Sequence, residues 1–149
     1  MGANAVKEQA AEAVREAKQR TGMTWREIAE GIDRPKEWTV SALLGMHPVP
    51  QELAEQVGEM LSLDERTVLA LQRQPVRTGL GDLADDPTIY RFLEAIAVYG
   101  PAIKELIHEE FGDGIMSAIN FNIDVSRREA VGGDRVVVTF DGKFLDYAW

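Results

Sequence analysis

The chain has 149 residues, the length of one domain or of two small ones, and it contains no cysteine. Disulfides, thiol nucleophiles, cysteine-ligated metals and iron–sulfur clusters are therefore excluded. Its formal net charge is -9, and no run of residues approaches the roughly 18 apolar positions of a membrane span. The N-terminal residues show neither an apolar signal core nor a myristoylation motif, so we expect a cytoplasmic protein with no membrane partner.

The negative charge is concentrated in the C-terminal part. Residues 1–80 carry 10 Lys or Arg against 12 Asp or Glu, whereas residues 81–149 carry 6 against 13. Nucleic-acid binding needs surplus cations that displace counterions from phosphate, and neither part has such a surplus. We therefore expect no nucleic-acid partner. An anion site in the acidic part would need a local cation, and one well-placed arginine would supply it.

Residues 1–80 are predicted to form an all-helical bundle, because apolar residues recur at helical spacing between cap signals. The predicted helices run from about Val6 to Gly22, from the capping box Thr24-Trp25-Arg26-Glu27 to Gly31, from an Asp33 cap to Gly45, across Leu53, Val57 and Leu61, and from Asp64 to about Gln72.

The second and third of these helices have the length and spacing of a helix-turn-helix. A DNA-binding interpretation would place four polar side chains toward the groove, namely Arg34, Lys36, Thr39 and Ser41. Glu37 and Trp38 in the same helix, and the weakly negative charge of the bundle, argue against it. We favour a bundle that only shares this shape.

Residues 74–86 are rich in turn formers and are predicted to be a linker between the parts 1–80 and 81–149. Asp86-Pro87 then opens a helix that runs to Tyr99, where Gly100-Pro101 is expected to break it, and a second helix runs to Gly112.

Strict alternation from Ile119 to Val125 predicts a half-buried strand, and Gly132-Gly133 turns the chain into a return strand over residues 136–140. Asp141-Gly142 predicts a further tight turn. The whole chain is thus expected to be α+β. So few elements make a thin second domain, which is expected to need a partner chain to bury both of its faces.

The helix over residues 88–99 carries the first candidate site. Tyr90, Ala95 and Val98 make its second face apolar as well, which is typical of a buried helix, and Arg91 and Glu94 are the only charges on it. Arg91 lies near the positive end of the helix dipole, so the pair suits helix stability poorly. A guanidinium with a carboxylate beside it suits a fixed anion receptor, although a structural ion pair fits the spacing equally well.

Ser117 is the second candidate, at the entrance to the alternating strand. Regular strand geometry there would point its hydroxyl to the side of Ile119 and Phe121, after a Gly112-Asp113-Gly114 segment that allows close backbone approach. The alternative is a structural serine bonded to a nearby carbonyl. No histidine is spaced to activate it, and neither His47 nor His108 belongs to a metal-binding motif.

Two segments resemble the cyanase family, also called cyanate hydratase or cyanate lyase. They are Asp-Pro-Thr-Ile-Tyr-Arg-Phe-Leu-Glu-Ala-Ile-Ala-Val-Tyr-Gly at residues 86–100 and Lys-Glu-Leu-Ile-His-Glu-Glu-Phe-Gly-Asp-Gly-Ile-Met-Ser-Ala-Ile-Asn-Phe at residues 104–121. Asp-Gly-Lys-Phe-Leu at residues 141–145 extends the match, and Ala-Leu-Leu-Gly at residues 42–45 carries it more loosely into the N-terminal part.

The resemblance implies that Arg91, Glu94 and Ser117 are the catalytic trio. It implies the decomposition of cyanate with bicarbonate as co-substrate, and neither a cofactor nor a metal. It further implies a helix-turn-helix-like first domain that does not bind DNA. The second domain would be catalytic and would interlock into dimers, five of which form a homodecamer with active sites shared between chains. The alternative function is a helix-turn-helix regulator whose C-terminal domain dimerises and senses a small anion.

Overall fold

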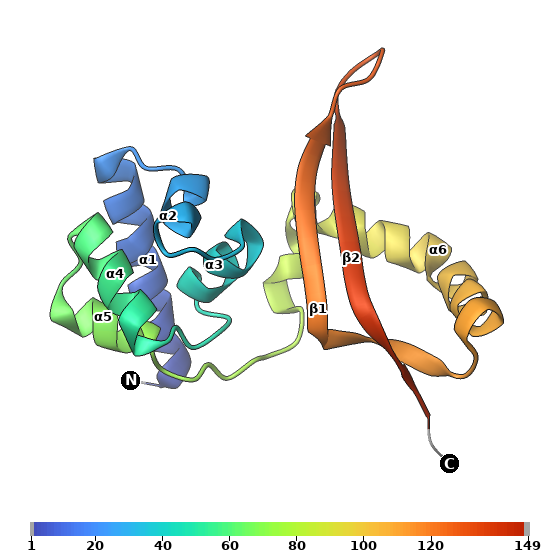
Figure 1. Ribbon diagram of the computed structural model, residues 1–149, viewed down its shortest axis with the longest axis horizontal. Coiled ribbons are helices and arrows are strands. Elements are labelled where there is room, and N and C mark those ends of the chain that lie inside the picture. Colours follow the sequence, from blue (N-terminus) through green and yellow to red (C-terminus); the bar gives the residue numbers. More distant parts are fainter. Residues whose placement is uncertain (1, 148–149) are drawn as a thin grey trace. The chain divides into compact units, whose positions relative to one another are not determined.

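The computed structural model describes residues 2–147 and divides into two compact units, unit 1 (Met1–Arg77) and unit 2 (Thr78–Trp149). Unit 1 is helical, and unit 2 combines a long helix with a β-hairpin, so the α+β class is confirmed (Figure 1). The elements are α1 (Ala3–Thr21), α2 (Trp25–Gly31), α3 (Lys36–Leu43), α4 (Gln51–Leu61), α5 (Glu65–Leu71), the 3-10 helix η1 (Gly81–Asp85), α6 (Pro87–Phe111), β1 (Gly114–Arg128) and β2 (Arg135–Asp146).

The caps of unit 1 follow the sequence closely. The Thr24 hydroxyl accepts a hydrogen bond from the amide of Glu27 at 3.1 Å, and the Asp64 carboxylate accepts one from Thr67 at 2.8 Å. Gly22 ends α1 in the left-handed conformation with φ 72°. Short helices fixed in this way surround one core of small and branched apolar side chains, including Val14, Ile28, Leu43, Val57 and Leu61.

The predicted Asp33 cap is wrong. Asp33 has a positive φ of 52° and its amide bonds to the carbonyl of Glu30, so this residue finishes the turn that follows α2. Pro35 takes the N-cap position of α3 instead. An aspartate in the left-handed region cannot also adopt the extended backbone of an N-cap residue.

A buried lysine connects three segments of unit 1. Lys7 is only 3% exposed, and its Nζ donates to the backbone carbonyls of His47 at 3.0 Å and Leu71 at 2.8 Å. Burial lowers the pKa of this amine below its usual value. The two bonds join α1 to the loop after α3 and to the end of α5.

In unit 2, α6 is one continuous helix from Pro87 to Phe111, so the expected break at Gly100-Pro101 is wrong. Proline removes one backbone donor and its ring clashes with the Cβ of the residue before it. The preceding residue here is Gly100, which has no Cβ, and Ala97, whose carbonyl loses its donor four residues before Pro101, is exposed, so water can satisfy that carbonyl. The helix therefore continues through a Gly-Pro pair, a pair that usually ends a helix.

The strands β1 and β2 pair as one antiparallel hairpin, whose turn contains Gly132 and Gly133 as predicted. The predicted turn at Asp141-Gly142 is wrong, because both residues belong to β2 and pair with Asn122 and Phe121. The predicted linker also contains more structure than expected, since η1 forms within it. Phe111 of α6 stacks on Phe144 of β2 at 5.2 Å between ring centroids, which ties the helix to the hairpin.

Unit 2 does not bury its own apolar side chains. All described hydrophobic residues that are buried lie in unit 1, whereas large apolar side chains along α6 and the hairpin are exposed. The burial expected for the helix over residues 88–99 is therefore not reached within a single chain. An apolar surface of this extent marks an interaction face.

We predict that Lys7→Met destabilises unit 1 by about 1–3 kcal/mol, because the carbonyls of His47 and Leu71 lose a buried donor. Urea unfolding followed by tryptophan fluorescence measures this, since Trp25 and Trp38 pack against the core of unit 1.

Lys18→Met is the matched control on the same helix. The Lys18 ammonium lies over the Trp25 ring at 5.1 Å, a contact worth at most about 1 kcal/mol at an exposed site. A Lys7→Met variant that is as stable as the unchanged chain would contradict the structural role of the amine.

Candidate active site

The first turn of α6 fixes where Arg91 stands. The Asp86 carboxylate accepts hydrogen bonds from the amides of Thr88 at 2.8 Å and Ile89 at 3.0 Å, and Pro87 occupies the first helical position. The cap and the proline set the start of the helix, and Arg91 follows one turn later. This part of the site was predicted correctly from the sequence.

Arg91 and Glu94 are brought together, as their spacing predicts. One guanidinium nitrogen of Arg91 lies 3.9 Å from Oε2 of Glu94, and the Arg91 guanidinium carbon lies 5.8 Å from the centroid of the Tyr90 ring. The single chain does not bury the pair, because the two side chains are 68% and 55% exposed. An exposed pair of this kind adds little stability, so its presence on an apolar helix calls for another explanation.

Arg91 borders an apolar groove of about 740 Å³ between α6 and β2. Among the described residues that line it, Arg91 is the only charged one. The others are Pro87, Thr88, Phe92, Ala95 and Ile96 of α6 together with Val136, Val138 and Phe140 of β2. A cation at the edge of an apolar groove attracts an anion strongly once water is excluded from the groove.

Ser117 stands in a bulge of β1, where the regular alternation expected from the sequence does not hold. Met116 pairs with Phe144 and Phe121 pairs with Gly142, so residues 117–120 stand opposite the single residue Lys143. As a result Ser117 is only 6% exposed while Ile119 is 97% exposed, although the two were expected on one face.

The Ser117 hydroxyl has a different partner from the carbonyl that the structural alternative assumed. Its oxygen accepts hydrogen bonds from the backbone amides of Ile119 at 3.1 Å and Asn120 at 3.0 Å. Both bonds use the hydroxyl as an acceptor, which leaves its proton to be donated elsewhere. Two incoming bonds also polarise the hydroxyl and strengthen it as a donor.

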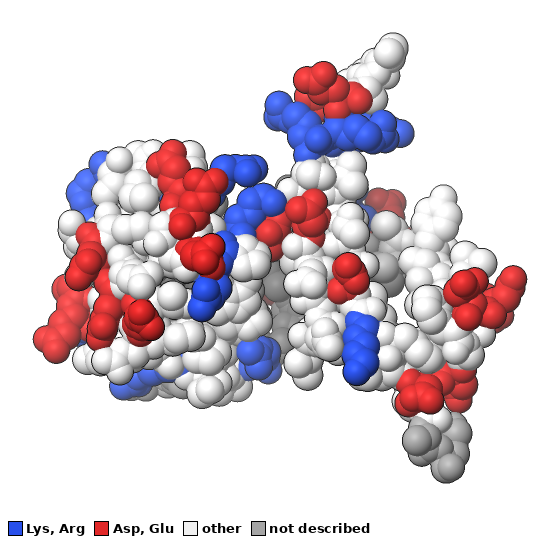
Figure 2. Space-filling view, viewed as in Figure 1, with Lys and Arg blue, Asp and Glu red and all other residues white. Residues whose placement is uncertain are grey.

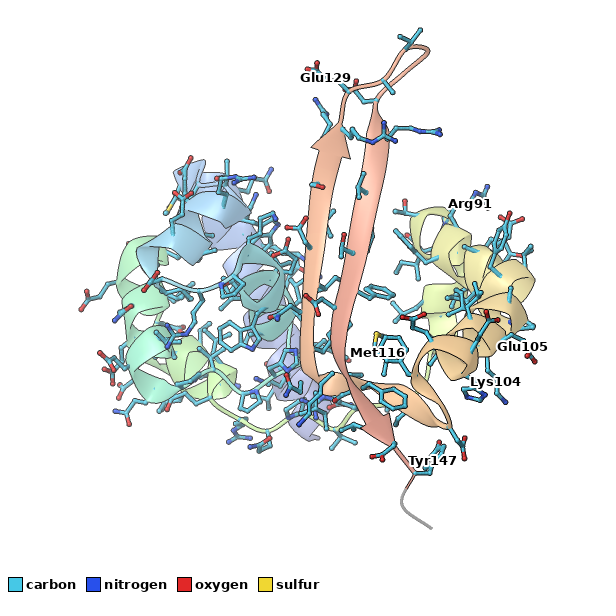
Figure 3. All side chains as sticks on the ribbon, turned by 45° about the vertical axis from the view of Figure 1, so that its right-hand side comes forward. Arg91, Lys104, Glu105, Met116, Glu129 and Tyr147 are labelled. Carbon is cyan, nitrogen blue, oxygen red and sulfur yellow. The ribbon has the colours of Figure 1, made fainter. Side chains whose placement is uncertain are left out.

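Within the described residues, no hydrogen bond, ion pair or groove joins Ser117 to Arg91 or Glu94. Figure 3 shows Arg91 toward the N-terminal end of α6, whereas Met116, the neighbour of Ser117, lies at the base of the hairpin. One chain therefore brings together two of the three predicted residues and holds the third apart.

The DNA-binding alternative loses a residue of its groove-facing set. Thr39 is fully buried, and its hydroxyl donates to the carbonyl of Pro35 at 2.9 Å. Lys36 forms an ion pair with Glu37 next to it. The face of unit 1 seen in Figure 2 exposes both acidic and basic side chains, in keeping with its charge balance.

Membrane spans and metal clusters are both absent from the part of the chain that the structure describes. No helix there is both long enough and apolar enough to cross a membrane. No three or more His, Cys, Asp or Glu side chains gather there as the ligands of a metal ion would.

The bulge at residues 117–120 and the groove beside β2 were not predicted from the sequence. Val136, Val138 and Phe140 stand two residues apart and so share one face of a strand, which was a signal for the groove wall. The bulge has no comparable signal, because strict alternation from Ile119 onward predicts a regular ladder.

Both units match known protein families. Residues 82–149 match the family model described as the cyanate lyase C-terminal domain, and residues 7–75 match that of the cyanate hydratase N-terminal part. A cyanate hydratase of Mycolicibacterium vanbaalenii is 64% identical over 86% of this chain and 84% of its own length. One of Pseudomonas syringae pv. syringae is 49% identical over 91% of this chain and 88% of its own length.

A solved structure shares the fold as well. The crystal structure of the cyanase from T. urticae aligns with a TM-score of 0.83 and 38% sequence identity, covering 91% of this chain and 96% of that chain. The matched regions include the α6 segment with Arg91 and Glu94 and the β1 segment with Ser117. The chain therefore belongs to the cyanase (cyanate hydratase) family.

Proposed function

We propose that this protein is a cyanate hydratase, a lyase that decomposes cyanate with bicarbonate. Cyanate, bicarbonate and one proton give carbamate and carbon dioxide, and carbamate takes a second proton to give ammonia and another carbon dioxide. Membership of the cyanase family supports the activity. The structural observation that carries the assignment of the site is Arg91, the one charged side chain among the described residues that line the apolar groove beside α6.

The main obstacle to this reaction is electrostatic. Two anions must meet and form a dianionic adduct, so mutual repulsion and the loss of hydration oppose the step. We assign to Arg91 the neutralisation of the developing charge, because a guanidinium keeps its proton and offers a planar fork of donors to a carboxylate. A preorganised donor of this kind is typically worth about 2.7–4 kcal/mol in the transition state.

We assign to Ser117 the binding of a bicarbonate or adduct oxygen. Its hydroxyl accepts two backbone bonds and has its proton free to donate, which suits contact with an anionic oxygen. The amides of Ile119 and Asn120 are engaged by the serine itself. They therefore act by holding the hydroxyl in place, and the substrate contact belongs to the hydroxyl.

Glu94 completes the proposed trio as the partner of Arg91. With its carboxylate 3.9 Å from the guanidinium, it limits the directions in which the fork can point and balances the charge of the site. Proton delivery to the cyanate nitrogen is a second role for this carboxylate, since the reaction consumes a proton at that atom.

A homo-oligomer completes the site in this proposal. Arg91 and Ser117 lie apart in one chain, and the apolar faces of α6 and the hairpin are uncovered. A second copy that covers these faces would exclude water from the groove and bring a serine to an arginine. The decamer of five interlocked dimers and the cytoplasmic location remain expectations from the sequence.

The decisive assay is ammonia release from cyanate by the purified protein, with and without added bicarbonate. We expect turnover that requires bicarbonate. Absence of ammonia, together with salt-sensitive DNA binding, would favour the regulator instead. Ammonia released at the same rate without bicarbonate would contradict the proposed reaction.

We predict that Arg91→Lys lowers turnover by at least ~100-fold, because a point charge replaces a planar fork. The melting temperature and the oligomeric state should change little, since lysine keeps the positive charge and an aliphatic stem at this position. Steady-state kinetics and thermal unfolding measure the two effects.

Arg127→Lys is the matched control, because Arg127 is 80% exposed and forms a comparable ion pair with Asp134 at 3.6 Å. It should retain wild-type turnover. If Arg91→Lys behaves like this control, Arg91 is not the anion receptor.

We predict that Ser117→Ala lowers turnover by at least ~10-fold and also destabilises the protein by about 1–3 kcal/mol, because two amides lose their acceptor. Oxalate, a small dianion shaped like the adduct, should raise the melting temperature of the wild type more than that of the variant. Thermal unfolding with and without oxalate measures this.

Ser126→Ala serves as the control on the same strand, where the side chain is exposed and the ladder is regular. A Ser117→Ala variant with full turnover and undiminished protection by oxalate would leave Ser117 with a structural role only.

A further inference from the structure

We propose that Gly142 of β2 is a positioning residue for the reaction, and the inference rests on the proposed role of Ser117. Gly142 pairs with Phe121 at the point where the regular ladder resumes after the bulge. It therefore lies directly beside the segment that carries the serine.

The reason for glycine at this position is space. A Cβ at residue 142 would lie 2.5 Å from the carbonyl oxygen of Ser117, and it would also overlap the side chain of Met116. The φ angle of Gly142 lies outside the left-handed region, so the backbone conformation itself does not require glycine. The missing side chain lets the bulge approach β2 closely.

Gly114 offers an internal comparison on the same hairpin. A Cβ there would also meet a backbone carbonyl, that of Leu145, and would lie 2.6 Å from Cζ of Phe144. Neither contact involves Ser117. The two glycines therefore present similar steric demands on one pair of strands, but only Gly142 acts on the serine.

A side chain at residue 142 would affect the reaction by moving the peptide group whose carbonyl belongs to Ser117. A side chain at residue 142 must push the Ser117 carbonyl away, because backbone cannot rotate aside as a flexible side chain can. Moving this peptide disturbs the two bonds that Ile119 and Asn120 donate to the Ser117 hydroxyl. A displacement of about 1 Å at a reacting group can cost ~100-fold in rate.

The first test is Gly142→Ala in the full-length protein, with Gly79→Ala as its matched control. A Cβ on Gly79 would meet no atom within 4 Å, and its φ lies outside the left-handed region, so the control should keep wild-type kinetics. We expect Gly142→Ala to lower kcat by at least ~10-fold. When the two variants lose the same melting temperature, Gly114→Ala should lower kcat less than Gly142→Ala does. An equal loss of kcat in the two hairpin variants would overturn the proposal.

A second test separates the serine from the methionine. Met116→Ala removes the side-chain atoms that a Cβ at residue 142 would overlap, but it leaves the Ser117 carbonyl in place. In this background we expect Gly142→Ala to recover melting temperature and still lose at least ~10-fold in kcat relative to Met116→Ala alone. Recovery of kcat would show that the space serves Met116, and it would overturn the proposal.

The Ser117→Ala background tests whether the effect passes through the serine. There, Gly142→Ala should cost less than about threefold in kcat, because the hydroxyl that it misplaces is already gone. The same fold-change in both backgrounds would overturn the proposal. So would failure of Gly142→Ala to fold both alone and with Met116→Ala, since the glycine would then support the hairpin as a whole.

The proposed function fails separately from this inference. A wild-type protein without bicarbonate-dependent turnover refutes the function, whereas an active wild type with an unaffected Gly142→Ala variant refutes only the positioning role.

Discussion

Unit 2 cannot bury its own apolar side chains, and the proposed site depends on how they are covered. A helix laid beside a two-stranded hairpin has too few layers to enclose a core, so α6 and β2 leave an apolar groove open. In the proposed oligomer, apolar surface buried between copies would add to the free energy of folding of such a unit. The same burial would remove water from around Arg91, and this would strengthen its attraction for anions.

Unit 1, in contrast, buries its own apolar side chains. Its five described helices close around a core of their own, and even the amine of Lys7 inside it has two carbonyl partners. Its helix-turn-helix-like shape is therefore a stable way to pack short helices, and the burial of Thr39 removes one side chain from any surface that would read DNA. The candidate chemistry lies entirely in unit 2.

The bulge of β1 is the local irregularity that the candidate site uses. A regular strand would expose Ser117 and Ile119 on one face, but the extra residues turn Ser117 inward and Ile119 outward. The serine then satisfies the amides of the residues that follow it, so one side chain stabilises the bulge and presents a hydroxyl. Dual use of this kind explains why its replacement is expected to affect both stability and turnover.

The sequence by itself determined the local features of this protein. Helix caps such as Thr24, Asp64 and Asp86, the Arg91–Glu94 spacing and the Gly132-Gly133 turn all depend on residues within a few positions of one another. The segments at residues 86–100 and 104–121 also carry the resemblance to the cyanase family in their sequence alone.

Only the tertiary structure decided the passage of α6 through Pro101, the course of β2 through Gly142 and the bulge at Ser117. Each depends on what a segment meets across space: solvent beside the helix, or a strand about twenty residues away along the chain. Periodicity along the sequence carries no record of such neighbours, because it describes which face a residue would occupy and cannot say what covers that face.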